Sequence, residues 1–434
     1  MAAKKKKAEE EDLPKVKRKP EDKVPSHRDR IDALEADVKK EFRGRAVMMN
    51  ASDYVLPYYY KRLPTGLPTL DVELKGGWPA GGLSQLIGRK NAGKTALMWM
   101  TVRQLQAFLG EKTRVLLAMT EIPADRKQGR LLGAQISLGD TDIEMMNDAR
   151  KAAGWPPFTK EEVANFKHEV GTIKEIHAES AEDFYDIILR AVEGNMFHLV
   201  VIDSIGNALA AAEQENESIK DKTYGGTSAP NTTFLKKLTN LLTMRTEWGE
   251  LRDTCVLGIN QVRDNIKDPN KKYKAPGGNS LEHAKLVDLY VESGGFIGGE
   301  ESIMTPEGRK NRWRAHGKEV FWTIEKGKAG LHEGAKGSYV YDFDTNSVNY
   351  FADAFVAGVM NGVVIAEGAW IGIPDPNDPE KFLMRIQGRE NFIAALAADF
   401  QAKANTDEMS YFEFIQDQCF RRNNIVPNNW DAWK

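Results

Sequence analysis

The fold is decided by the stretch Gly82-Leu-Ser-Gln-Leu-Ile-Gly88-Arg-Lys-Asn-Ala-Gly93-Lys94-Thr95. A short apolar run with strand character leads into Gly88, the pattern G-x-x-x-x-G-K-T follows, and a helix-forming run begins directly after it. This order of strand, loop and helix is the context that a phosphate-binding loop requires. Glycines let backbone N–H groups turn inward around a triphosphate, and the helix dipole favours negative charge there. The stretch therefore predicts a nucleotide site.

The side chains of this loop suit ATP with Mg²⁺ as cofactors. We expect Lys94 to reach the β- and γ-phosphates and the Thr95 hydroxyl to ligate Mg²⁺. The alternative is a glycine-rich turn with an exposed lysine, and the strand-loop-helix context argues against it. The residues predicted to contact the nucleotide in this loop are Gly88, Arg89, Lys90, Asn91, Ala92, Gly93, Lys94 and Thr95.

Length and composition restrict the other function classes. The chain has 434 residues, enough for one large domain with appendages or for two to three domains. No apolar run approaches the roughly 20 residues that span a bilayer, and no apolar segment follows the lysines near the N-terminus. Cys255 and Cys419 lie far apart, which fits a reducing cytoplasm and gives no disulfide framework. With a net charge of −3, any nucleic-acid contact has to come from local patches.

A charged segment and a short helix precede the loop. Residues 1–25 are nearly all charged or proline, so we expect them to be disordered. A helix is predicted from Ser26, because Ser26 and Asp29 have capping-box spacing. Its apolar face is formed by Ile31, Leu34, Val38 and Phe42, and residues 45–49 look extended. These two elements cannot form a core alone and need the main domain or a neighbouring copy.

Apolar strands alternate with helices after the loop, which indicates a parallel sheet covered on both faces. A glycine-rich run, Gly76–Gly82, is interpreted as a flexible turn before the first strand of this sheet. The predicted strands are 114–121, 198–204, 254–261, 286–292, 320–325 and 338–343, and the predicted helices are 96–110, 180–193, 232–250 and 353–361. On the helix 180–193, Phe184, Ile187, Ile188 and Ala191 are expected to share one apolar face. Toward the C-terminus we expect a small hairpin at 363–371, a linker at 374–380, and helices at 390–402 and 411–422.

Two carboxylates end strands of this sheet, and ligands bind at the carboxyl ends of such strands. Asp203 follows Val200-Val-Ile, and Glu121 follows the strand 114–121. Taken alone, Asp203 could equally cap the next turn. Beside a phosphate loop it is better interpreted as the residue that orients the Mg²⁺ shell, with Glu121 as the general base for the attacking water.

Two long polar segments, 210–228 and 264–279, interrupt the domain, and such segments are usually functional or disordered. The second places lysines around Tyr273, and basic residues beside a stackable ring suit single-stranded nucleic acid. An ordinary lysine-rich loop is the alternative. The lysines are Lys267, Lys271, Lys272 and Lys274.

The whole pattern resembles the RecA family of DNA strand-exchange proteins, including its phage UvsX-type members, over roughly residues 28–370. The resemblance rests on Pro64-Thr-Gly-Leu-Pro-Thr-Leu-Asp71, the phosphate loop, Glu121, Val201-Ile-Asp203-Ser204, Ile259-Asn-Gln261-Val-Arg263, Gly277-Gly-Asn279 and Glu325-Lys-Gly-Lys328. Arg89 and Lys90 depart from the family, which usually has proline and an acid there. Gln128 stands where the family has an adenine-stacking aromatic.

The resemblance implies roles for further residues. Glu121 matches the catalytic glutamate, Asp203 the acid of the second nucleotide motif, and Gln261 the glutamine that senses the γ-phosphate. Lys326 and Lys328 match lysines that reach a neighbouring protomer's ATP, and Asp125 lies where the family contacts adenine. Segments 210–229 and 264–280 match the two DNA-binding loops, with Tyr224, Gly225, Gly226, Arg263, Lys267, Lys271, Lys272, Tyr273, Lys274, Gly277, Gly278 and Asn279 as DNA contacts.

The resemblance also implies the architecture and the activity. It implies a RecA-like P-loop ATPase core of α/β class, a mostly parallel twisted sheet with helices on both faces, at 63–350. A charged tail (1–27), an N-terminal helix-strand polymerisation arm (28–62) and a small α/β C-terminal lobe (351–434) would complete the chain.

The implied activity is ATP-dependent DNA strand exchange by a filament on single-stranded DNA, acting on homologous duplex in a bacterial or phage-infected cytoplasm. Single-strand-binding and mediator proteins are further implied partners, and no membrane is. A ring helicase or translocase, and a nucleotide-binding regulator of a recombinase, remain as alternatives.

Overall fold

The chain divides into two compact units, Met1–Val55 and Leu56–Lys434, in a computed structural model. The described residues are 26–42, 56–59, 61–120, 123–205, 228–246, 250–264, 273–274, 278–305, 308–328, 330–404 and 406–425. None of the helices in these ranges is both long and apolar enough to cross a membrane. The predictions for residues 1–25 and 45–49 lie outside the described residues.

The described part of the first unit is helix α1 (His27–Phe42). The predicted capping box at its start is confirmed: Ser26 N donates to Asp29 at 2.8 Å, and Asp29 N donates to Ser26 Oγ at 3.1 Å. These bonds satisfy backbone and side-chain groups that a helix start otherwise leaves without partners. Ile31 and Leu34, on the predicted apolar face, are both exposed.

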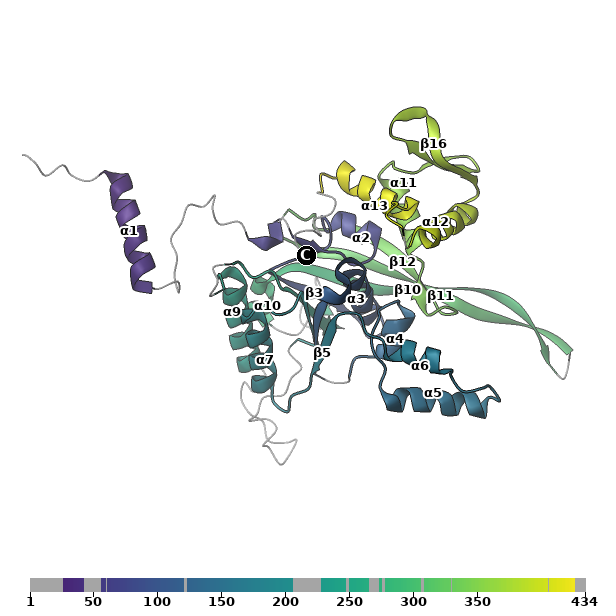
Figure 1. Cartoon of the computed structure of the whole chain (residues 1–434), viewed down its shortest axis with the longest axis horizontal. Helices are drawn as coiled ribbons and strands as arrows, with labels where there is room; N and C mark the ends of the chain where they lie inside the picture. Colours follow the sequence, from purple (N-terminus) through teal and green to yellow (C-terminus); the bar gives the residue numbers. More distant parts are fainter. Residues whose placement is uncertain are drawn as a thin grey trace, which may run out of the picture. The chain divides into compact units, whose positions relative to one another are not determined.

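The second unit is built on a nine-stranded sheet, which confirms the predicted α/β class (Figure 1). The six strands from β10 to β5 run parallel, and β11, β12 and β13 add an antiparallel extension. In spatial order the strands are β13 (Ser347–Val348), β12 (Lys336–Asp342), β11 (Gly308–Gly327), β10 (Lys285–Thr305), β3 (Leu83–Gly88), β7 (Cys255–Gln261), β6 (Leu199–Asp203), β4 (Arg114–Met119) and β5 (Thr172–Ile176).

Helices cover both faces of this sheet (Figure 1). Helix α3 (Lys94–Leu109) packs on one face, and α7 (Ala181–Glu193), α9 (Ser228–Thr243) and α10 (Gly278–Ala284) pack on the other. Successive residues of β4 divide between the two cores: Leu117 packs with α3, whereas Leu116 and Ala118 pack with α7 and α9. Successive side chains of a strand point to opposite faces of the sheet, and both faces are buried here. Consecutive residues are therefore apolar, which explains the continuous apolar runs in the sequence.

Two helices differ from the prediction, α7 in the residues of its buried face and α9 in the positions of its ends. On α7, Phe184 and Ile188 are buried as expected, but Ile187 is 42% exposed and Tyr185 is buried in its place, stacked on Phe234 at 4.3 Å. Helix α9 begins at Ser228 and ends at Thr243, earlier at both ends than the predicted 232–250. Its end is fixed from outside, because the Arg252 guanidinium donates to the carbonyls of Leu241, Met244 and Arg245.

The glycine-rich run before β3 is buried and ordered, so its interpretation as a flexible turn was wrong. It contains β2 (Trp78–Pro79), which pairs with β1 (Arg62–Leu63), and it follows α2 (Pro68–Glu73). A Cβ on Gly77 would lie 2.1 Å from the Leu63 carbonyl oxygen, and Gly77 has a φ of +123°. Gly77 is therefore required by close packing.

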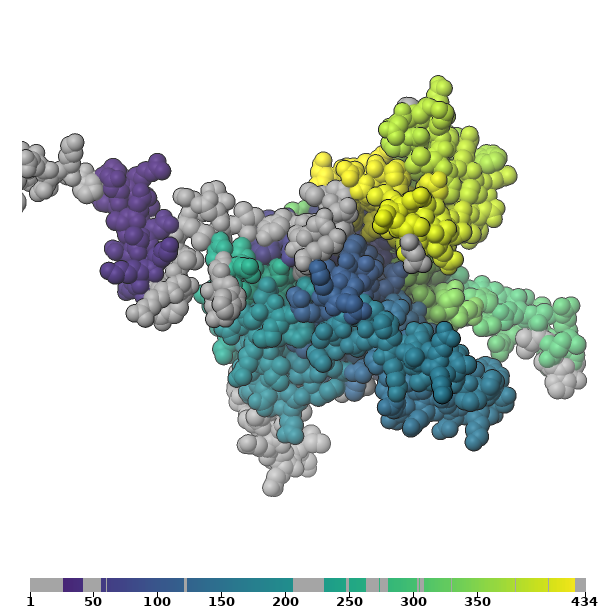
Figure 2. All heavy atoms as spheres, viewed as in Figure 1, coloured from purple at the N-terminus to yellow at the C-terminus, as the bar shows by residue number. Residues whose placement is uncertain are grey.

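Strand β5 and three helices were not predicted. They are α4 (Arg126–Leu131), α5 (Asp140–Ala152) and α6 (Lys160–Lys167), which lie between β4 and β5. Strands β10 and β11 also run well past the predicted 286–292 and 320–325, and their outer part forms a hairpin that stands clear of the sheet (Figures 1 and 2).

The C-terminal lobe begins with α11 (Tyr350–Met360) and has its own core. Its remaining elements are β14 (Ile365–Glu367), β15 (Trp370–Asp375), β16 (Asp378–Gln387), α12 (Arg389–Lys403) and α13 (Tyr411–Arg422). The predicted hairpin and the last two helices are confirmed. The predicted linker at 374–380 was wrong, because Asp375 and Asp378 pair across the turn of a second hairpin.

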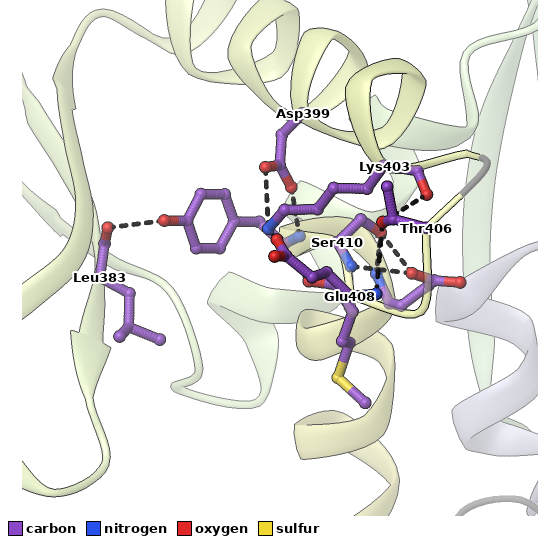
Figure 3. Close-up of polar contacts among 9 residues, drawn as sticks. Leu383, Asp399, Lys403, Thr406, Glu408 and Ser410 are labelled. Carbon is purple, nitrogen blue, oxygen red and sulfur yellow. Dashed lines mark hydrogen bonds and ion pairs between the residues drawn. The ribbon is translucent and has the colours of Figure 1, made fainter.

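Polar contacts fix the connection between α12 and α13 (Figure 3). Asp399 accepts from the backbone N–H of Tyr411 at 2.6 Å and pairs with Lys403 at 3.1 Å, and the Tyr411 hydroxyl donates to the Leu383 carbonyl at 3.0 Å (Figure 3). Ser410 and Glu413 form a capping box that starts α13. Tyr411 thus joins α13 to α12 through Asp399 and to β16 through the Leu383 carbonyl.

Asp353 connects the C-terminal lobe to α2 through Thr69. Its carboxylate is 5% exposed and accepts from the Thr69 backbone N–H at 2.9 Å and from the Thr69 hydroxyl at 2.7 Å. Burial raises the pKa of Asp353 to about 6, although the bonds from Thr69 oppose this rise. A raised folded-state pKa contributes stability that is present below the unfolded pKa and is lost as the pH rises through about 6.

The variant Asp353→Asn should therefore show a smaller loss of unfolding free energy between pH 4 and pH 6 than the parent chain. The rise from 3.8 to about 6 corresponds to a pH-dependent difference of about 3 kcal/mol between the two proteins. Thermal unfolding across this pH range measures it. Asp407→Asn, which removes an exposed carboxylate of the same lobe, serves as the control for the loss of one acidic side chain.

Candidate nucleotide-binding site

The phosphate loop leaves the sheet at Gly88, between two parallel neighbours. Gly88 lies in register with Val291 of β10 and with Gln261 of β7. A Cβ at Gly88 would lie 2.2 Å from the Val291 carbonyl oxygen, so no other residue fits this position without moving a strand. The first glycine of the motif is therefore required by the spacing of the sheet.

The second glycine starts α3. Gly93 is the N-cap residue with a φ of +106°, and an added Cβ would lie 2.9 Å from the Tyr339 hydroxyl. The loop is held from β11 as well, because Lys318 Nζ donates to the Asn91 carbonyl at 2.6 Å. The first N–H groups of α3 have no partner within the helix and carry the positive end of its dipole. This arrangement is suited to phosphate.

Lys94 is buried inside the loop, with 7% of its surface exposed. Its ammonium group donates to the Gly88 carbonyl at 2.9 Å and to the Arg89 carbonyl at 2.7 Å. An ammonium has three donors, so one remains for a ligand. Burial lowers the pKa of Lys94, and the nearby Asp203 carboxylate acts against that decrease. Lys94 and Asp203, predicted from separate motifs, are therefore electrostatic neighbours.

Asp203 ends β6, in register with Met119 of β4 and Ile259 of β7. Its carbonyl accepts from the backbone N–H of Thr120 at 2.8 Å. Thr95 lies in the first turn of α3 and is partly exposed. A carboxylate and a hydroxyl are oxygen ligands of the kind that Mg²⁺ takes beside phosphate. The loop, Lys94 and these oxygens together fit a nucleoside triphosphate with its Mg²⁺.

Gln261 is the last residue of β7 and is exposed beside Gly88. The next residue, Val262, donates its N–H to the Gly88 carbonyl at 3.3 Å. The chain then continues into β8 (Arg263–Asp264), which pairs with β9 (Tyr273–Lys274). Helix α10 begins at Gly278, so the segment predicted as a continuous polar loop at 264–280 contains short strands and a helix start.

Several predicted residues lie outside the described ranges, and they are Glu121, Tyr224, Gly225, Gly226, Lys267, Lys271, Lys272 and Gly277. Of Arg263, Lys274, Gly278 and Asn279 only the backbone placement is described. Their contacts with water or DNA stay predictions.

Asp125 has a local partner. It is the N-cap residue of α4, and its carboxylate accepts from the Gln128 backbone N–H at 3.0 Å. This contact satisfies the start of the helix. Contact with adenine stays a prediction.

Lys326 and Lys328 lie away from the phosphate loop of their own chain. Lys326 pairs in register with Asp288, which pairs with Gln85 near the middle of β3. The Lys326 ammonium donates to the Glu282 carbonyl, and that of Lys328 donates to the His283 carbonyl at 3.2 Å. Both lysines therefore bind the C-terminal end of α10, where the helix dipole favours cations.

Three contributors to this site were not predicted. Lys318 and Tyr339 reach the loop from β11 and β12, and Tyr290 of β10 lies in register with Ile87, the residue before Gly88. Each is more than 190 positions away along the chain, and no local pattern marks them. The only signal would have been that β10, β11 and β12 continue the sheet outward from β3, in that order.

Comparison with known proteins agrees with this geometry. A profile of the family described as AAA domain matches residues 60–227. Protein RecA from Francisella tularensis subsp. novicida (strain U112) and from subsp. tularensis (strain SCHU S4 / Schu 4) are each 25% identical over 269 residues. Each match covers 62% of this chain and 62% of the relative, so less than two thirds of either protein is compared. The matched domain, the distant similarity and the observed sheet and loop are together consistent with a RecA-like P-loop ATPase core.

Proposed function

We propose that the protein is an ATP-dependent DNA strand-exchange protein that forms helical filaments on single-stranded DNA and hydrolyses ATP at protomer interfaces. One observation carries the proposal. Gln261 lies beside Gly88 of the phosphate loop, and three residues later the chain enters the segment 264–280 that is expected to bind DNA. Only the dipeptide Val262-Arg263 would thus lie between Gln261, at the nucleotide site, and the DNA segment.

Residues of this chain divide the chemistry as follows. Lys94 and the loop N–H groups hold phosphate oxygens, and Thr95 and Asp203 hold Mg²⁺. Glu121 takes the proton of the attacking water as general base. Gln261 contacts the terminal phosphate from the end of β7. Bound ATP with Mg²⁺ supplies a phosphoanhydride whose cleavage limits the lifetime of the DNA-bound state.

Lys326 and Lys328 act in the proposal on the nucleotide of a neighbouring protomer. Their distance from the phosphate loop of their own chain supports a role in trans, because β11 runs antiparallel to β10 and ends toward the start of β3. Their contacts to α10 would be exchanged for phosphate contacts when protomers assemble. Self-association is therefore part of the active site.

DNA is held in the proposal by phosphate contacts and stacking rather than by base readout. The contacts come from Tyr224, Gly225 and Gly226 of one segment and from the lysines around Tyr273 in the other. Homologous duplex would be recognised by base pairing between strands, so the protein needs no base-reading residues. Cys255 and Cys419 are buried free thiols, which fits the cytoplasm as the place of action.

Hydrolysis and imaging test this proposal together. We expect single-stranded DNA to raise ATP turnover at least tenfold, and electron microscopy with an ATP analogue and DNA to show open helical filaments. Closed rings would favour the helicase or translocase reading. Unchanged turnover of a Glu121→Gln variant would favour a nucleotide-binding regulator. Turnover that ignores DNA, without filaments, contradicts the proposal.

A further inference from the structure

Strand β11 presents a lysine to the phosphate loop. The Lys318 ammonium donates to the Asn91 carbonyl at 2.6 Å, across 227 positions of the chain. Val320, two residues further on, faces the same side of β11, and a Cβ added at Gly93 would lie 3.2 Å from its side chain. The contact from Lys318 is therefore part of a close approach between β11 and the loop.

This contact fixes the orientation of one peptide group in the loop. In a planar trans peptide, the carbonyl and the following N–H point in opposite directions. Because the Asn91 carbonyl points toward Lys318, the Ala92 N–H points away from β11. It donates to the Arg89 carbonyl at 3.3 Å, and the same carbonyl accepts from the Lys94 ammonium at 2.7 Å. The Ala92 N–H is thus directed to the place where Lys94 is held.

The backbone of the loop favours an anion at this place. Asn91 has a φ of +59° and Gly93 a φ of +106°, so left-handed residues flank Ala92 on both sides. Asn is among the residues that tolerate this region. Turns with left-handed residues direct successive N–H groups into one concavity that binds anions. The Ala92 N–H is therefore suited to donate to a phosphate oxygen in place of the Arg89 carbonyl.

The charge of Lys318 adds to this effect. The side chain is partly buried, burial lowers its pKa, and no carboxylate pairs with it within the part of the chain that the structure describes. The Asn91 carbonyl is therefore the group on which this charge acts. A cation at a carbonyl oxygen polarises the peptide and makes its N–H a stronger donor.

We propose that Lys318 is a positioning residue of the nucleotide site, which orients and polarises the Asn91–Ala92 peptide so that its N–H binds a phosphate oxygen. It acts through the loop backbone and does not touch the nucleotide. The antiparallel extension of the sheet is then part of the site, and the loop sequence alone does not determine phosphate affinity. The inference rests on nucleotide binding, one part of the function proposed above, and makes no use of DNA.

Titration of the full chain with fluorescent mant-ADP and Mg²⁺ measures the contribution of Lys318. Lys318→Met keeps the length of the side chain and removes its charge and donors. We expect it to bind mant-ADP ~10-fold more weakly, the size typical of one hydrogen bond to a charged group. Lys318→Arg restores charge and donors, so its Kd should return to within about threefold of the parent value. Lys318→Gln keeps a donor without the charge and should lie between Lys318→Met and the parent.

Lys336→Met is the matched control, because it makes the same change at an exposed lysine of the neighbouring strand β12. Its Kd should stay within about twofold of the parent value, as for most surface substitutions. Thermal unfolding shows which variants are folded. Folded Lys318→Met or Lys318→Gln that binds mant-ADP as tightly as the parent overturns the inference.

The orientation of the peptide has a readout that needs no nucleotide. The amide nitrogen shift of Ala92 is sensitive to the hydrogen bond that the Asn91 carbonyl accepts. We label the chain with ¹⁵N-alanine, and Ala92→Gly identifies the Ala92 signal by its loss. Without nucleotide, we expect this signal to move in Lys318→Met and to keep its position in Lys336→Met.

The two measurements separate the inference from its alternatives. Weaker binding by Lys318→Met with an unmoved Ala92 signal would mean that Lys318 acts by its charge at a distance, and that result also overturns the inference. A parent chain that binds no mant-ADP contradicts the proposed function, whereas the Ala92 signal still decides whether Lys318 holds the peptide.

Discussion

Lys94→Ala should lower the rate of ATP hydrolysis roughly 10²–10³-fold, the size typical for loss of one preorganised donor in an active site. Lys94 is buried inside the loop, and its ammonium group donates to the Gly88 and Arg89 carbonyls. Its removal leaves the developing negative charge of the transition state without that partner. Turnover measured at saturating nucleotide, with and without single-stranded DNA, gives the result.

Two controls make this result specific. Lys94→Arg keeps the charge but cannot place a compact ammonium between two carbonyls, so its turnover should lie between those of the parent and Lys94→Ala. Thermal unfolding without nucleotide should show that both variants remain folded. Hydrolysis by Lys94→Ala at the parent rate would contradict the assignment of the nucleotide site.

The second large effect concerns stability. Gly88→Ala should lower the free energy of unfolding by ~3 kcal/mol or more, because overpacking of a close-packed site forces the backbone to shift. The added Cβ would lie 2.2 Å from the Val291 carbonyl oxygen, and both atoms belong to paired strands at the centre of the sheet. The unfolding temperature should fall by roughly 5 °C or more.

Gly295→Ala is the matched control, because it makes the same change in β10 at a position where nothing lies within 4 Å of the added Cβ. Its unfolding temperature should stay close to that of the parent chain. If Gly88→Ala were equally stable, the close approach of β3 and β10 at the loop would be wrong.

Features with a local cause were predictable from the sequence. Strands β4, β6 and β7 are buried on both faces of the sheet, and such burial requires consecutive apolar residues, which are visible in the sequence. The capping box at Ser26 and Asp29 and the glycines of the phosphate loop are also local signals. The same patterns placed Asp203 and Gln261 at the carboxyl edge of the sheet.

Features with a distant cause were missed. Helix α9 ends early because Arg252 binds the carbonyls at its end. The segment Pro374-Asp375-Pro376 has the composition of a linker, but Asp375 pairs with Asp378 in a hairpin. The outer β10–β11 hairpin lacks the apolar alternation of a buried strand, since Phe296, Met304 and Trp313 are exposed there. Sequence periodicity reports burial, and exposed strands carry little of it.

The site was predicted best where one motif contains its residues. Lys318, Tyr339 and Tyr290 reach the loop only because β10, β11 and β12 extend the sheet beside β3. Lys326 and Lys328 were expected at a nucleotide, and in a single chain they bind the end of α10. Their expected partner belongs to another copy.

Strand exchange between circular single-stranded DNA and homologous linear duplex tests the central claim most directly. We predict joint molecules and then nicked circles when ATP is present, none with ADP, and none for Lys94→Ala. Heterologous duplex should give no product. Absence of joint molecules with the parent chain, ATP and homologous DNA, under conditions where the protein hydrolyses ATP, would contradict the account.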